Sequence, residues 1–274
     1  MILRLPSLKR LVQTWQGLTQ PLYWLYEQRL SEEVRKQGQM PKHLGLILDG
    51  NRRFARSLGL KPSQGHDLGA AKVREVLDWC YELGINHVTL WVFSTDNRRR
   101  DSEEVNHLLN LFADEAMKEA EGRDFRENGV KVTIIGDLAT MPERVVEALR
   151  HLEAATANHD RFFLNVAVGY GGREEITHAV RSWLVDAKQQ GATLEQTIAQ
   201  LDSDVIAEHL YTAGFPDPDF VIRTSGELRL SGFLLWQTAY SEFYFCDVFW
   251  PSFRKLDFLR AIRSFQARRR RFGR

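Results

Sequence analysis

The chain has 274 residues, of which 43% are hydrophobic, which is enough to bury a substantial core without a metal or a disulfide to hold the fold together. Its 37 Lys and Arg residues nearly balance its 36 Asp and Glu residues, so the net charge of +1 excludes a general attraction to nucleic acid. Two isolated cysteines, Cys80 and Cys246, fit a reducing cytoplasm, and no apolar run is long enough for a signal peptide or a membrane span.

Residues 1–40 differ in pattern from the rest and are predicted to form a helical extension. Apolar residues recur at near-helical spacing from Leu5 to Leu18, and Pro21 is predicted to interrupt the helix before a second, amphipathic stretch from Leu22 to Gln37. Two interpretations remain open. The helix packs on the core or on a second subunit, or it lies on a membrane surface, because basic residues flank its Trp and Leu side chains.

Residues 41–274 alternate between two kinds of apolar pattern and are predicted to form one domain. Short apolar runs predict buried strands at 44–48, 87–93, 130–135, 162–168 and 220–222. Between them, a 3.6-residue apolar period predicts helices, and the first of these ends at Gly84. A second begins near Asp101, which is spaced from Glu104 like a capping box, and a third begins near Pro142. The alternation predicts an α/β fold with a mostly parallel central sheet flanked by helices.

Polar segments follow the predicted strands at the sheet edge where ligands bind in such folds. They are residues 49–53, 94–100, 169–173 and 223–231, and they are rich in Gly, Arg and carboxylates. Each segment alone is as consistent with a turn or an exposed loop, and Asp137 at the same edge is interpreted as a turn residue. Together they favour a site for a polyphosphate and a hard divalent cation, because Arg grips phosphate oxygens and Mg²⁺ prefers few carboxylates plus phosphate and water.

Motifs of other phosphate-handling enzymes are absent from the sequence. There is no G-x-x-x-x-G-K-[ST], which excludes a P-loop. Asp49 lacks the second Asp, two positions on, that an aspartyl-phosphate phosphatase needs. No D-D-x-x-D is present, which argues against a trans-type prenyl synthase.

The order and spacing of these segments resemble the cis-prenyltransferase family, which includes undecaprenyl diphosphate synthase. The resemblance extends from about Pro41 to Gly273, and although one segment alone is weak, the joint match is highly specific. The matching segments are 48–55, 65–66, 93–97, 165–172, 219–227 and 233–242.

The resemblance implies a Mg²⁺-dependent transferase that joins isopentenyl diphosphate to an allylic diphosphate and forms a cis (Z) double bond. It also implies a homodimer in which a hydrophobic tunnel lies beneath the edge of the sheet. No nucleic-acid partner is expected, and the expected location is the cytoplasm, with peripheral membrane contact if the N-terminal helix lies on a membrane surface.

Individual roles follow from the same resemblance. Asp49 would position Mg²⁺ and assist departure of the allylic diphosphate, Glu242 would complete the metal site, and Asn97 would help to remove the proton that fixes the new double bond. The residues expected around the allylic diphosphate are Gly50, Asn51, Arg52, Arg53, Phe54 and His66. Those expected to bind isopentenyl diphosphate are Arg223, Arg229, Leu230 and Ser231. A mobile loop that carries Ser94, Asp96, Asn97 and Arg100 is expected to close over both substrates, and Thr95 and Arg98 are also expected to bind substrate.

Several positions bear on product length and on assembly. Arg271 to Gly273 resembles a terminal R-x-G that reaches the neighbouring subunit's site. Many long-chain members have Arg at the position of Pro62, Trp at that of Arg98 and His at that of Leu228. Each departure could alter allylic substrate binding or loop closure without removing the core chemistry.

The segment from Pro21 to Glu27 and the paired arginines 52–53 resemble the short-chain branch, the (Z)-farnesyl diphosphate synthases. Val92 replaces the Ala of long-chain members and is predicted to narrow the tunnel, which favours a C15 product made from geranyl or dimethylallyl diphosphate.

Three other functions are alternatives to a short-chain cis-prenyltransferase. One is a long-chain decaprenyl or undecaprenyl diphosphate synthase that makes a lipid carrier. Another is a non-catalytic partner subunit, which could lose Asp49 or the arginine cluster, although both are present here. The third is a nucleic-acid-binding module built on Arg268 to Arg271, which the balanced charge and the short basic run disfavour.

Overall fold

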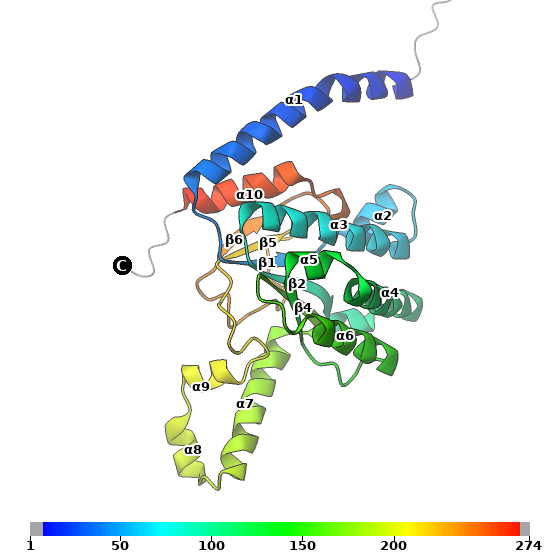
Figure 1. Ribbon diagram of the computed structural model, residues 1–274. Coiled ribbons are helices and arrows are strands. Elements are labelled where there is room, and N and C mark those ends of the chain that lie inside the picture. Colours follow the sequence, from blue (N-terminus) through cyan, green and yellow to red (C-terminus); the bar gives the residue numbers. More distant parts are fainter. Residues whose placement is uncertain (1–7, 269–274) are drawn as a thin grey trace, which may run out of the picture.

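A sheet of six parallel strands forms the centre of the computed structural model, which describes residues 8–268 and, from residue 23 onward, their side chains (Figure 1). The strands lie side by side in the order β3-β4-β2-β1-β5-β6. Along the chain they are β1 (His43–Ile47), β2 (His87–Ser94), β3 (Val130–Ile135), β4 (Phe162–Tyr170), β5 (Phe220–Arg223) and β6 (Glu242–Phe245). The first five confirm the predicted strands. The sixth was missed because it is a short aromatic run with no polar alternation.

Most of the helices pack along one face of this sheet, and others extend beyond it. They are α1 (Leu8–Gln37), α2 (Asn51–Ser57), α3 (Pro62–Leu83), α4 (Ser102–Glu121), α5 (Asp124–Asn128), α6 (Glu143–Thr156), α7 (Gly172–Gln189), α8 (Leu194–Gln200), α9 (Ser203–Glu208) and α10 (Lys255–Ala267). Two 3₁₀ turns, η1 (Thr95–Arg99) and η2 (Trp250–Ser252), complete the described elements. Figure 1 shows α7, α8 and α9 as an arm that projects away from the sheet. The predicted α/β class with a mostly parallel sheet is confirmed.

Alternation along the strands divides the core into two parts. Leu44 and Leu46 of β1 belong to the larger cluster, which also takes in buried residues of α3, α4, α6 and α10. Ile47 belongs to a smaller cluster with Phe233 and Leu234, from the segment between β5 and β6. Because successive side chains of a strand point to opposite faces, one sheet face carries the helices and the other is covered mainly by that segment.

The helix ends agree in part with the predicted signals. Gly84 caps α3 in the left-handed conformation with φ 71°, as predicted. Helix α6 begins directly after Pro142, also as predicted. Asp101 caps α4 by accepting a hydrogen bond from the backbone N–H of Glu103 at 2.9 Å, but the predicted capping box is wrong. The Glu104 side chain turns away from the cap and bonds His66 instead.

Helix α1 is continuous through Pro21, so the predicted interruption is wrong. Proline removes one backbone hydrogen bond and commonly bends a helix without ending it, and Figure 1 shows the helix bending along its length. Its C-terminal part packs on the core: Leu30 and Val34 are buried, and Gln266 of α10 donates to the Val34 carbonyl at 2.9 Å.

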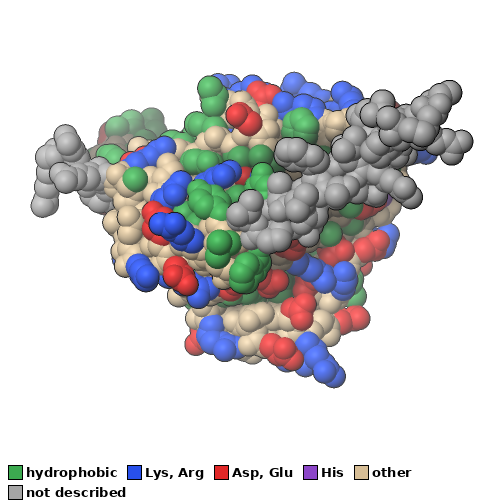
Figure 2. All heavy atoms as spheres, turned by 90° about the horizontal axis from the view of Figure 1, so that it is seen from above, with side chains coloured by type: hydrophobic (Ala, Val, Ile, Leu, Met, Phe, Trp, Pro, Cys, Tyr) green, Lys and Arg blue, Asp and Glu red, His purple; other side chains and the backbone are tan. Residues whose placement is uncertain are grey.

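The outer side of this part of α1 carries exposed apolar side chains. Trp24 and Leu25 are 63% and 59% exposed, and Figure 2 shows hydrophobic and charged side chains interspersed on this side of the molecule. Among the helices of the described residues, none combines the length and hydropathy that a membrane crossing needs. The side chains before residue 23, on which the membrane-surface interpretation depends, lie outside the description, as does Arg271 to Gly273.

A polar chain crosses the middle of the sheet and fixes the protonation of a buried histidine. The Nδ1–H of His43 donates to the Pro216 carbonyl at 2.6 Å, so Nε2 accepts from the Thr89 hydroxyl at 2.7 Å. The Asn165 amide in turn donates to Thr89 at 3.2 Å. Burial lowers the pKa of His43 from 6.5 to about 4, although the hydrogen bond to the Pro216 carbonyl opposes the shift.

We therefore expect His43 to destabilise the fold as the pH falls. An unfolded chain binds this proton near pH 6.5 and the folded chain only near pH 4, so stability is full above 6.5 and is lost between 6.5 and 4. The loss amounts to about 3 kcal/mol. Urea unfolding across this window should show a shallower pH dependence for His43→Gln than for the wild type. The exposed His151→Gln should retain the wild-type slope, and equal slopes for all three would contradict the assignment.

Candidate active site

A polar pocket of about 420 Å³ lies at the edge of the sheet where β1, β2 and β5 end. Parallel strands place their carboxyl ends at one edge, and this brings together segments that are far apart in the sequence. Twelve of the predicted site residues line the pocket: Asp49, Gly50, Asn51, Arg52, Arg53, His66, Ser94, Asp96, Asn97, Arg100, Arg223 and Ser231. Five arginines, with Arg56 included, outnumber two aspartates in its lining, so the pocket favours an anion.

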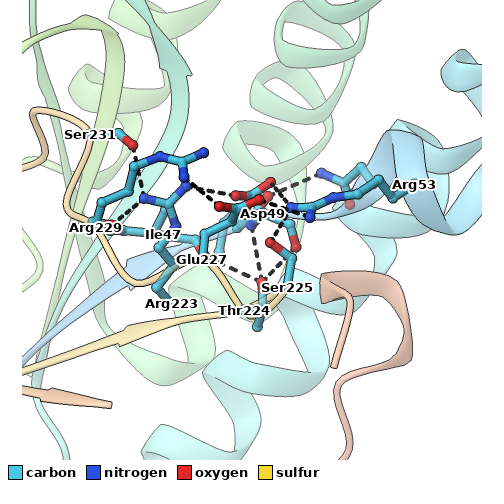
Figure 3. A network of polar contacts seen from close by, with 11 residues as sticks. Ile47, Asp49, Arg53, Arg223, Thr224, Ser225, Glu227, Arg229 and Ser231 are labelled. Atoms are coloured by element: carbon cyan, nitrogen blue, oxygen red, sulfur yellow. Dashed lines mark hydrogen bonds and ion pairs between the residues drawn. The ribbon is translucent and has the colours of Figure 1, made fainter. Parts of the chain in front are cut away.

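Asp49 is at the centre of the polar network (Figure 3). Its Oδ2 accepts a hydrogen bond from Arg223 at 2.8 Å, and its Oδ1 lies 3.5 Å from Arg53. Burial alone would raise the pKa of this carboxyl, but the hydrogen bond and charge of Arg223, assisted by Ser225 and Arg53, lower it below its ordinary value. Asp49 is therefore ionised at neutral pH and available to a cation.

Arg223 is held rigidly beneath the pocket. Its side chain is 5% exposed, and besides Asp49 it donates to the Ser231 hydroxyl at 2.9 Å and to the Arg229 carbonyl. Ser225 and Ser231 both have positive φ, at 78° and 52°. Non-glycine residues adopt this conformation at a cost, and such strain clusters at functional sites. The loop after β5 is thus built around the guanidinium of Arg223.

Glu227 connects two further arginines in the same loop. It accepts from Arg53 at 2.9 Å and from Arg229, while the second amino group of Arg53 donates to Ser225 at 2.6 Å (Figure 3). Arg229 itself is 62% exposed and does not line the pocket. The sequence motif includes Glu227, but this bridging position was not predicted.

Glu104 organises the opposite side of the pocket. Its Oε1 accepts from His66 at 3.1 Å and from Arg100 at 3.1 Å, and its Oε2 lies 3.4 Å from Arg52. The carboxylate is 8% exposed, so it is a buried anion shared by three cationic or potentially cationic groups. Burial lowers the pKa of His66 although Glu104 opposes the shift. The sequence analysis missed Glu104 because its spacing from Asp101 imitates a helix cap.

Arg56 is a charged residue of the pocket lining that was not predicted. It follows Arg52 by four residues on α2, and residues with this spacing share one face of a helix. The four-residue spacing could therefore have predicted from the sequence that Arg56 faces the same side as Arg52.

The segment after β2 turns some predicted residues toward the pocket and others away. The Asn97 side-chain oxygen accepts from the Ser94 N–H at 3.0 Å, which closes the η1 turn. Arg98 points away and donates to the Asp137 carbonyl at 3.4 Å. The Asp137 side chain accepts from the Ala139 N–H at 3.0 Å, which confirms its interpretation as a turn residue.

The remaining predicted residues lie outside the pocket lining. They are Phe54 on α2, Thr95 and Arg98 in η1, Arg229 and Leu230 in the loop after β5, and Glu242 in β6. Leu230 instead packs against the smaller core cluster. Their roles in binding remain predictions.

Glu242, which was predicted to share a metal with Asp49, lies away from the polar pocket. It begins β6 beside Phe220, at the level of Leu44, and accepts from Arg268 at 2.7 Å. Asp49 lies five residues beyond Leu44, or about 16 Å farther along the strand direction. One chain therefore does not bring the two carboxylates together.

An apolar cavity of about 170 Å³ opens from the polar pocket. It lies between the sheet and helices α3, α4 and α6, and its lining is mainly Leu, Val, Ile and Phe. The two hollows share their lining at Leu48, Asn51, His66, Val92 and Leu108. A ligand with an anionic head and an apolar tail would fit across this junction.

The described residues include no group of three or more His, Cys, Asp or Glu side chains that could hold a metal. Among the described residues, Asp49 and Asp96 are the carboxylates that line the pocket, and Asp49 is the one that its arginine neighbours keep ionised. That arrangement fits Mg²⁺ bound together with a diphosphate, since Mg²⁺ retains waters and takes one or two carboxylates plus substrate phosphates.

An α/β sheet with an arginine-rich pocket above an apolar cavity defines an enzyme that handles diphosphates of apolar groups. The sequence profile of a family described as "Putative undecaprenyl diphosphate synthase" matches residues 47–273. The chain therefore belongs to this family of cis-prenyltransferases, as the sequence resemblance predicts.

Relatives and a solved structure agree with this assignment. An isoprenyl transferase of Thermus thermophilus is 60% identical over 94% of this chain and 98% of its own. A (2Z,6E)-farnesyl diphosphate synthase of Thermobifida fusca is 51% identical over 92% of this chain and 97% of its own. The crystal structure of lavandulyl diphosphate synthase from Lavandula x intermedia, in complex with dimethylallyl diphosphate, has a TM-score of 0.80 and 32% identity, and covers 86% of this chain and 99% of its own.

The approach of α2 to α3 beside the pocket requires glycine at position 65. A Cβ there would lie 2.3 Å from the Asn51 carbonyl oxygen, far inside contact distance. Although Ala favours a helix by about 1 kcal/mol over Gly, we expect Gly65→Ala to destabilise the fold by about 1–3 kcal/mol through overpacking. Thermal unfolding tests this, with the exposed Glu75→Ala of the same helix as control. A raised Tm for Gly65→Ala would show that the close approach is not required.

Proposed function

We propose that the protein condenses isopentenyl diphosphate with geranyl or dimethylallyl diphosphate and forms a cis (Z) double bond, with (Z)-farnesyl diphosphate as product. The observation that carries this proposal is the junction of the two hollows at Val92 and Leu108. An allylic diphosphate spanning it would place its charged head among arginines and its hydrocarbon among leucines and valines. The reacting carbon would then lie at the boundary between them.

Both substrates are anionic, and different arginines would bind each of them. Arg52, Arg53 and Arg100 surround the space in front of Asp49, where the allylic diphosphate would bind. Arg223, already bonded to Ser231, would hold isopentenyl diphosphate against it. Alignment of two reactants in fixed positions supplies much of the rate enhancement in such reactions.

The chemistry consists of one bond broken, one bond formed and one proton lost. The allylic C–O bond breaks and the diphosphate leaves with the electron pair, while the isopentenyl double bond attacks the allylic carbon. The arginines stabilise the charge on the leaving diphosphate, because they are preorganised where that charge develops. Mg²⁺ at Asp49 would add Lewis-acid stabilisation of the same group. Asn97, which lines the pocket, would assist removal of the proton that creates the new double bond.

The homodimer implied by the sequence resemblance gives Glu242 a role. Since Glu242 and Asp49 of one chain lie at different ends of the sheet, a shared metal would require Glu242 from a second copy.

The residues at the cavity mouth and the similarity to one relative both favour a C15 product. Val92 lies at the mouth of the apolar cavity, where a larger side chain narrows the passage. Similarity to the farnesyl diphosphate synthase of Thermobifida fusca supports the same product. The second candidate is a long-chain synthase, which the description of the matching family favours. A non-catalytic partner subunit is disfavoured because Asp49 and Arg223 are retained and paired.

We expect the purified protein to turn over radiolabelled isopentenyl diphosphate in the presence of Mg²⁺. Dimethylallyl, geranyl and farnesyl diphosphates would be offered separately and the products sized by chromatography. The first two should give C15 product. Asp49→Ala should lower turnover by about 10²–10³-fold, since it removes the carboxylate that would hold the cation at the leaving group. The exposed Asp160→Ala is the control and should keep wild-type turnover.

The other outcomes separate the alternatives. Products of C50 or longer would move the protein to lipid-carrier synthesis with the same chemistry. No product with any primer would overturn the enzyme assignment and favour the partner subunit.

Val92→Ala tests the tunnel mouth. Removing two methyl groups from the junction should lengthen the product by about one isoprenoid unit, because the passage widens while the charged side chains of the polar pocket are unchanged. Product sizing by chromatography measures the change. An unchanged product profile would refute this role for Val92.

A further inference from the structure

A cluster of charged side chains lies in the wall of the apolar cavity. Arg74 of α3 donates to Glu115 of α4 at 3.1 Å and also to Glu119 of α4. All three line the cavity, and among its described lining residues they are the only Lys, Arg, Asp or Glu side chains. We call these three residues the α3–α4 latch.

The latch is placed where charges are costly to separate. The Glu119 side chain is 11% exposed, and burial raises its pKa although Arg74 opposes the shift. Arg74 and Glu115 are 37% and 38% exposed, so the cluster extends from solvent into the cavity wall. Breaking a partly desolvated ion pair leaves each charge with less solvation than it has in water, so the latch resists opening.

Helices α3 and α4 are bridged by polar contacts at both ends of the cavity. Near the site, His66 bonds Glu104 at 3.1 Å and Asp67 bonds His107 at 2.8 Å. Farther along, the latch makes the next bridge. Between these bridges the helices contribute apolar side chains to the cavity wall: Val73, Leu108, Leu111 and Phe112. The latch therefore closes the seam between the two helices at the end remote from the polar pocket.

The volume of the cavity and the distance from the polar pocket to the latch both bear on product length. A cavity of about 150 Å³ holds benzene, which has six carbons. The cavity here has about 170 Å³, so a hydrocarbon tail fills it early in growth and each further isoprenoid unit must displace its walls. Leu108 also lines the polar pocket, and Glu115 and Glu119 follow it along α4 by about 10 and 16 Å. An isoprenoid unit has four bonds along its chain and spans about 5 Å, so the tail meets the latch after two or three units.

We propose that the latch, Arg74 with Glu115 and Glu119, is a specificity determinant that limits product length by holding α3 and α4 together across the cavity. This proposal rests on the proposed prenyl transfer and identifies residues that stop growth near C15. A longer tail would have to part the ion pairs or lie against them, and an apolar chain compensates neither charge.

The test uses Arg74→Ala and, because the first variant leaves Glu119 unpaired, Arg74→Ala/Glu119→Ala as well. Products would be sized as for the wild type, and both variants should shift the distribution upward by at least one isoprenoid unit. Arg74→Lys, which keeps the charge, should return the products toward wild-type length. Arg144→Ala is the matched control: Arg144 also bridges two helices, to Asp114 of α4, but lies outside the cavity lining, so its products should not change.

A binding measurement makes the result independent of turnover. Calorimetry with farnesyl and geranylgeranyl diphosphate should show a preference of the wild type for the shorter ligand, reduced about tenfold in Arg74→Ala. Equal preference in wild type and folded variants, with unchanged products, would overturn the latch. A wild type that already makes products longer than C15 would refute the proposed product, yet the latch would still stand if the variants extend them further.

Discussion

The ion pair between Asp49 and Arg223 is the interaction on which the rest of the site depends. The two residues are 174 positions apart, and they meet because β1 and β5 are adjacent parallel strands that end at one edge. The pair keeps Asp49 ionised in a half-buried position, where desolvation alone would favour the neutral acid. Arg223 in turn fixes the strained loop that carries Ser225 and Ser231.

Around this pair, a polar pocket and an apolar cavity adjoin each other. A diphosphate needs cations that are held in place, whereas an isoprenoid tail needs a dry apolar surface, and the two must meet within a few bonds. The sheet edge supplies the first and the sheet face beneath α3 and α4 supplies the second. Glu104 lies between them: one buried carboxylate positions His66, Arg52 and Arg100 beside the junction.

The same division explains how α3 and α4 are held. Two helices that packed fully against each other would bury more apolar area, but they would leave no room for a hydrocarbon chain. Here polar bridges connect them while the side chains between line a cavity. The cavity between α3 and α4 therefore lowers the stability that tighter packing would give, and such a loss is common at functional sites.

The sequence by itself determined the α/β class and five strands, because apolar periodicity is a local property of the chain. Strand-end chemistry indicated most of the twelve predicted residues that line the polar pocket, and the family resemblance added His66. Only the tertiary structure decided that Glu104 serves the site rather than a helix cap, since its partners His66 and Arg100 approach from other elements. Tertiary structure also separated Glu242 from Asp49, because strand register is set by packing and not by the motif itself.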